Sequence, residues 1–111
     1  MKNKSHTTDG RTFPHSVEAE EGVLGCMLIN NESVSKAIQL LDSRSFYNTN
    51  NSIIFQNMIE LFENNHKIDY ISLTDKLKKN KQLSDIGGAY YITGLSNNAP
   101  SAHNVEYYVQ I

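Results

Sequence analysis

The stretch that decides the fold is VEAEEGVLGCMLI, residues 17–29. Placed on a helix at about 100° per residue, its apolar side chains cover roughly half of the circumference. Gly22 and Gly25 lie on part of the remaining arc, and positions without side chains let a neighbouring backbone come close. Glu20 falls inside the apolar arc, so it needs either a partner or a route out to solvent. The stretch predicts a central helix, capped by Ser16, around which the rest of the chain packs.

Amphipathic spacing continues on both sides of short polar loops. It predicts further helices over residues 32–41, 52–64, 73–79, 89–95 and from 101 to the end of the chain. The connection between the first two is so short that they are expected to lie antiparallel. Ser72 is the expected cap of the fourth helix, and the pair Gly87 and Gly88 marks a turn before the fifth.

The remaining loops and faces give more specific expectations. Phe46 and Tyr47 stand together in the polar stretch 42–51, and both are expected to pin that loop to the core. On the third helix, Phe62 belongs to the buried side and Asn57 to the outer side. Tyr91 lies on the apolar side of the fifth helix. Adjacent tyrosines point about 100° apart, so Tyr90 and Tyr91 cannot both be buried.

Length and pattern together define the fold class. A chain of 111 residues forms one domain that buries about two-thirds of its unfolded surface. No strand-like alternation survives more than a few residues. We therefore predict an all-α fold, a compact bundle of about six short helices over residues 13–111, after a polar, disordered tail over residues 1–12. Because the last helix is still periodic at Ile111, we expect a continuation in a longer protein.

Charge and cysteine content restrict the possible partners. The net charge is −2, with acidic and basic residues interspersed, which disfavours cationic binding of nucleic acid. Lys76, Lys78, Lys79 and Lys81 cluster near a helix end and keep a helical nucleic-acid-binding or adaptor module open as the alternative. The single cysteine, Cys26, fits a reducing compartment. Without an apolar leader or span, the expected location is the cytoplasm, with no membrane.

Residues that carry chemistry do not form a catalytic pattern. The four histidines are scattered among probable loops, and the aspartates show no paired spacing. No nucleophile elbow or glycine-rich phosphate loop is present. We therefore expect no catalytic, cofactor-binding or metal-binding residue in this chain, and predict a non-catalytic interaction module.

Five blocks of sequence carry a resemblance to a known family. In order along the chain they read PHSVEAEEGVLGCML (14–28), SFYN (45–48), IDYISLTDKL (68–77), QLSDIGGAYYITGL (82–95) and NNAPSAHNVEYYVQI (97–111). Together they resemble the N-terminal domain of the DnaB family of replicative DNA helicases. Ser45 departs from the family, which usually has Asp before the Phe-Tyr pair. The loss of a cap or of a loop hydrogen bond at this corner is expected to loosen it by about 1 kcal/mol.

The resemblance implies a role in DNA replication. In the family, the helical head joins other subunits in the collar of a hexamer and docks primase within the primosome. A separate motor domain binds ATP and magnesium and unwinds duplex DNA. The parent protein would therefore be an ATP-dependent DNA helicase, with DNA as a partner of the motor, while this chain carries no catalytic site and no cofactor.

Two residues are candidates for the partner interface. Glu18 faces solvent near the start of the first helix, and exposed tyrosines offer a large contact area at low entropic cost. We expect Glu18 and Tyr91 to lie on or near a surface that faces primase or another subunit. The alternative is that these tyrosines are simply half-buried.

Overall fold

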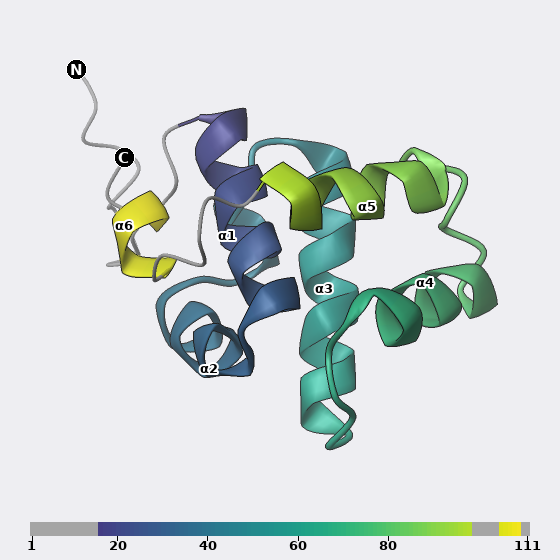
Figure 1. Cartoon of the computed structure of the whole chain (residues 1–111), viewed down its shortest axis with the longest axis horizontal. Helices are drawn as coiled ribbons and strands as arrows, with labels where there is room; N and C mark the ends of the chain where they lie inside the picture. Colours follow the sequence, from purple (N-terminus) through teal and green to yellow (C-terminus); the bar gives the residue numbers. More distant parts are fainter. Residues whose placement is uncertain (1–15, 99–104, 110–111) are drawn as a thin grey trace.

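The computed structural model describes residues 16–98 and 105–109 (Figure 1). Within these ranges the chain forms six α-helices and one 3-10 helix and contains no strand, which confirms the all-α prediction. The expected disordered tail and the expected start of the last helix at Ser101 lie outside the described residues. The elements are α1 (Val17–Ile29), α2 (Asn31–Leu40), η2 (Ser43–Ser45), α3 (Thr49–Glu63), α4 (Tyr70–Lys79), α5 (Gly88–Asn98) and α6 (Val105–Val109).

Helix α1 is the central element that its composition predicts. It packs against α2, α3, α5 and α6, and Figure 1 shows it surrounded by these helices. Ser16 caps its start by accepting the Ala19 backbone N–H at 3.0 Å. Both predicted close-approach glycines, Gly22 and Gly25, are buried, and Gly22 lies under the ring of Tyr108 in α6. The absence of a side chain at residue 22 therefore lets α6 dock on α1.

Helix α2 crosses α1 instead of lying antiparallel to it. In Figure 1, α2 is seen nearly end-on, whereas α1 runs down the picture. A single residue, Asn30, separates the two helices, and its backbone is extended. One extended residue redirects the chain without reversing it, so the antiparallel expectation was wrong.

Three helix boundaries differ by three residues from the sequence-based expectation. Helix α3 begins at Thr49 because Asn48 caps it one turn earlier than expected. Helix α4 begins at Tyr70 because the cap is Asp69, not Ser72: the Asp69 carboxylate accepts the Ser72 backbone N–H. The Ser72 hydroxyl in turn accepts the Asp69 backbone N–H, which completes a capping box. Helix α5 runs beyond Leu95 to Asn98.

Two side-chain placements on α3 were also wrong. Asn57, expected on the outer side, is buried and donates to the Ile53 carbonyl and to Gln82, while it accepts from Asn80. Phe62, expected on the buried side, is 41% exposed at the end of the helix. Asn57 is buried because Asn80 and Gln82, which follow α4, bond to its side chain, whereas Phe62 lies beyond these contacts near the end of α3.

The loop 42–48 is pinned by one aromatic residue, not two. Phe46 is buried and packs on Phe55 with ring centroids 4.8 Å apart, but Tyr47 is 92% exposed. Ser45 does not loosen this corner: its hydroxyl accepts the Asp42 backbone N–H at 3.1 Å and completes a capping box. The expected loss of a cap was therefore wrong.

Candidate partner-binding surface

Glu20 is the buried anchor of a polar network under the surface formed by α1 and α5. Its side chain is 1% exposed, yet its two oxygens accept three hydrogen bonds. Oε2 accepts the Tyr47 backbone N–H at 2.6 Å, and Oε1 accepts the Asn48 N–H at 3.3 Å and Asn51 Nδ2 at 2.9 Å. This arrangement supplies the partner that the apolar position of Glu20 required.

Asn51 extends this network to the surface. Its side chain is fully buried, and its Oδ1 accepts the hydroxyl of Tyr91 at 2.6 Å. The same hydroxyl lies 3.3 Å from Glu21 Oε2. Because a phenol carries a single hydrogen, the shorter bond to Asn51 takes it and Glu21 is the second available acceptor.

The environment of Tyr91 keeps its hydroxyl protonated. Burial raises the pKa of the Tyr91 phenol to about 12, and the nearby Glu21 carboxylate adds to the increase. The phenol therefore remains a hydrogen-bond donor throughout the physiological pH range. Tyr91 is half-buried, and its hydroxyl points into the network while its neighbour Tyr90 is 89% exposed. The prediction that these two tyrosines cannot both be buried is confirmed.

The structure brings the two predicted interface residues to one face. Glu18 is exposed and lies one helical turn before Glu21, whose carboxylate contacts Tyr91. We call the face formed by Glu18, Glu21, Tyr90 and Tyr91 the α1–α5 face. Tyr90, not singled out by the sequence as an interface residue, is its most exposed aromatic side chain. The signal for it was the tyrosine pair, of which only one member can point inward.

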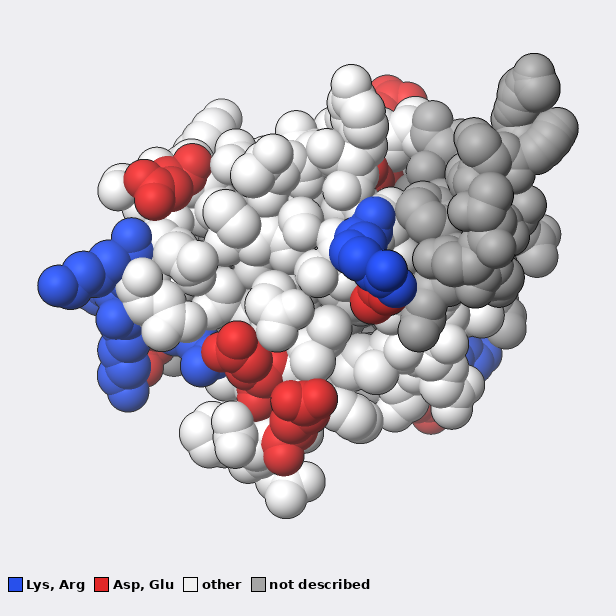
Figure 2. Space-filling view, turned by 180° about the vertical axis from the view of Figure 1, so that it is seen from behind, with Lys and Arg blue, Asp and Glu red and all other residues white. Residues whose placement is uncertain are grey.

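The basic cluster at the end of α4 is partly neutralised. Lys76 pairs with Glu60 at 3.0 Å, and Lys79 pairs with Asp75 at 3.3 Å. Figure 2 shows several blue side chains gathered at one end of the molecule, with further blue groups near the middle and at the opposite edge of this face and acidic groups between them. On the face seen in Figure 2, the described residues therefore form no continuous basic stripe along which a phosphate backbone could bind.

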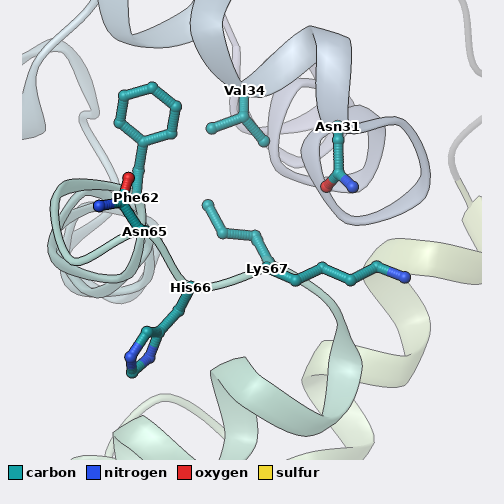
Figure 3. Close-up of a pocket in the computed structure, with 7 residues that line it drawn as sticks. Asn31, Val34, Phe62, Asn65, His66 and Lys67 are labelled. Carbon is teal, nitrogen blue, oxygen red and sulfur yellow. The ribbon is translucent and has the colours of Figure 1, made fainter.

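A hollow of about 530 Å³ lies between the start of α2 and the end of α3 (Figure 3). Its lining residues are Asn31, Val34, Phe62, Asn65, His66, Lys67 and Ile68. Figure 3 shows the Phe62 ring and Val34 facing the hollow, whereas the His66 imidazole points away from them. These lining residues provide no nucleophile with an adjacent base and no paired carboxylates. The hollow includes neither Glu18 nor Tyr91.

Within residues 16–98 and 105–109, no three His, Cys, Asp or Glu side chains come together in a way that could hold a metal ion. In the same ranges, no helix has the length and apolarity needed to cross a bilayer.

The chain is similar in sequence to one family of proteins, the DnaB-type helicases. The family model for the DnaB-like helicase N-terminal domain matches residues 12–111. Replicative DNA helicase DnaB from Treponema pallidum (strain Nichols) is 36% identical over 111 residues, which are 100% of this chain and 25% of that relative. Replicative DNA helicase DnaB from Rhodothermus marinus is 36% identical over 106 residues, which are 96% of this chain and 11% of that relative.

A solved structure supports the same assignment. The crystal structure of the N-terminal domain of DnaB helicase from Mycobacterium tuberculosis superposes with a TM-score of 0.83 and 27% identity, covering 87% of this chain and 69% of that one. This chain spans only a quarter or less of the two helicase relatives described above. The family match extends over nearly all of the chain, and the chain therefore belongs to the DnaB-like helicase N-terminal domain family.

Proposed function

We propose that this chain is the non-catalytic head of a replicative DNA helicase, acting in hexamer collar assembly and primase docking during DNA replication. The observation that carries the proposal is the family match over residues 12–111. Relatives called replicative DNA helicase extend far beyond the matched segment. ATP and magnesium would bind to a motor outside this chain, which would unwind duplex DNA in the cytoplasm.

The chemistry of the α1–α5 face supports a docking role. It combines an exposed carboxylate, Glu18, with the exposed ring of Tyr90 and the half-buried ring of Tyr91. Tyrosines with one apolar and one polar end are typical anchors of protein interfaces, because they bury a large area at low entropic cost. A carboxylate beside them selects a partner that presents a basic group.

The proposal is tested by titrating the chain with purified primase from the source organism and by sedimentation of the chain alone. Glu18→Ala and Tyr90→Ala are expected to weaken primase binding or self-association about tenfold or more, as expected for interface anchors. Glu32→Ala is the matched control, since Glu32 is an exposed glutamate in the first turn of α2. It is expected to leave both properties unchanged.

Two results would contradict the proposal. The first is a wild-type chain that neither binds primase nor associates with itself at concentrations up to about 1 mM, the weak limit for specific recognition. The second is that Glu18→Ala, Tyr90→Ala and Glu32→Ala bind primase and associate with themselves equally well, while circular dichroism shows that all three are folded. The second result would place the partner surface elsewhere on the domain.

A further inference from the structure

A line of buried hydrogen bonds connects the core to the α1–α5 face. It runs from Glu20 in α1 through Asn51 in α3 to Tyr91 in α5, with bonds of 2.9 Å and 2.6 Å. Asn51 is 0% exposed. It therefore cannot touch a partner at the surface, although it is bonded directly to a residue of that surface.

The Asn51 side chain has one favourable arrangement in this site. Its Nδ2 donates to Glu20 and its Oδ1 accepts from Tyr91, so rotating the amide by 180° would place a donor against the Tyr91 hydroxyl and an acceptor against a carboxylate. A buried polar group left unpaired is costly, so the network favours a single geometry. The position of the Tyr91 hydroxyl is determined by this geometry.

The first turn of α5 depends on Tyr91 for its attachment. The helix begins at Gly88, and both Gly87 and Gly88 have positive φ, where the backbone is least restricted by side chains. Tyr90 points outward, and the buried apolar residues of α5, Ile92 and Leu95, come later in the helix. The Tyr91 hydroxyl therefore ties this turn to the body of the domain, through its short bond to Asn51 and its longer contact with Glu21.

We propose that Asn51 is a positioning residue for the α1–α5 face: through the Tyr91 hydroxyl it holds the first turn of α5, and with it Tyr90 and Tyr91, in the orientation that a partner binds. This inference rests on the proposed docking function. It assigns a role in recognition to a side chain that the partner never contacts.

A double-mutant cycle with primase as the probe tests the inference. Asn51→Ala and Tyr91→Phe are each expected to weaken binding about 3- to 10-fold, because a less ordered turn must be ordered again on binding. Both substitutions remove the bond between Asn51 and Tyr91, while Tyr91→Phe also removes the contact with Glu21 and Asn51→Ala the bond to Glu20. The double variant is therefore expected to weaken binding by less than the product of the two single effects. Tyr91→Phe retains the ring and serves where Asn51→Ala folds poorly.

Asn57→Ala is the matched control. Asn57 is the other buried asparagine of α3, and its side chain makes three hydrogen bonds where that of Asn51 makes two, but to Ile53, Asn80 and Gln82, away from α5. It is expected to lower stability to a similar extent and to leave primase affinity unchanged. If Asn57→Ala weakens binding as much as Asn51→Ala does, the effect follows global stability and the inference is wrong.

Amide hydrogen exchange separates this inference from the proposed function. Asn51→Ala and Tyr91→Phe are expected to speed exchange at the amides of residues 92–95, whose helical acceptors lie in the first turn of α5. Asn57→Ala is not expected to speed exchange at these amides more than elsewhere in the domain. Unchanged exchange in α5 overturns the inference whatever the partner does, whereas failure of the wild-type chain to bind primase or itself overturns the proposed function.

Discussion

The ring of Tyr108 lies directly over the Cα of Gly22, where a β-carbon would sit 2.8 Å from Cγ and still closer to Cδ1 and Cε1. Atoms of an L-residue side chain do not approach a ring so closely, so only glycine at residue 22 allows this contact. The contact joins the central helix α1 to α6, which packs on it.

Gly22→Ala is expected to lower the free energy of unfolding by about 1 to 3 kcal/mol, because the new methyl group displaces the Tyr108 ring. Gly94→Ala is the control: this glycine lies inside α5, and a β-carbon there meets nothing within 4 Å. Its replacement is expected to stabilise the domain by about 0.5 to 1 kcal/mol. Urea unfolding measures both changes. Equal stabilisation by the two substitutions would show that the Tyr108 contact does not constrain residue 22.

Glu20→Gln is expected to destabilise the domain by about 2 to 3 kcal/mol. The amide replaces one acceptor with a donor, and in either orientation that donor faces an N–H of Tyr47, Asn48 or Asn51. Glu18→Gln makes the same change at an exposed position of the same helix and is expected to alter stability by less than about 0.5 kcal/mol. Urea denaturation of both variants checks the difference, and similar midpoints would contradict the role of Glu20.

Ser45→Ala is expected to cost about 1 kcal/mol, because the buried hydroxyl accepts the Asp42 backbone N–H. Ser35→Ala is the control, since Ser35 is exposed on α2, and its effect is expected to stay within about 0.5 kcal/mol. Thermal unfolding compares the two. A neutral Ser45→Ala would mean that water replaces the capping hydroxyl.

Lys81→Gly is expected to stabilise the domain by about 0.5 to 1 kcal/mol. Lys81 has a φ of 59°, in the left-handed region that favours glycine, and it ends α4 with Lys81 N–H donating to Lys78 and Gln82 N–H donating to Leu77. Lys78→Gly removes the same charge from within α4 and is expected to destabilise by a similar amount. Changes of opposite sign in the free energy of unfolding, measured by chemical denaturation, support the backbone explanation. Changes of the same sign would assign the effect to the lost charge.

Tyr91→Phe is expected to lower stability by about 0.5 to 1.5 kcal/mol at neutral pH through loss of the hydrogen bond to Asn51. The folded-state pKa of about 12 lies above the ordinary value of 10.0. The phenol contribution is therefore fully present below about pH 10 and is lost as the pH rises through about 12. The stability difference between wild type and Tyr91→Phe should stay constant from pH 6 to 9 and narrow above 10. A difference that widens there would reverse the assigned direction of the pKa shift.

The sequence by itself determined the helical class, the central position of residues 17–29 and the conflict of Glu20 with its apolar surroundings, which required a partner or a route to solvent. These properties depend on local periodicity and on side-chain polarity, which can be read from the sequence without knowing which helices contact one another. The prediction that Tyr90 and Tyr91 cannot both be buried has the same origin, because successive residues of any helix point in different directions.

Only the tertiary structure decided which groups meet. The caps at Asn48 and Asp69, the burial of Asn57, the exposure of Tyr47 and the bond between Asn51 and Tyr91 depend on where other helices cross. Residues 51 and 91 are 40 positions apart, and no local pattern relates them. Their contact follows from the way α1 brings α3 and α5 together, because a buried hydrogen bond forms only where folding places a donor beside an acceptor and excludes water.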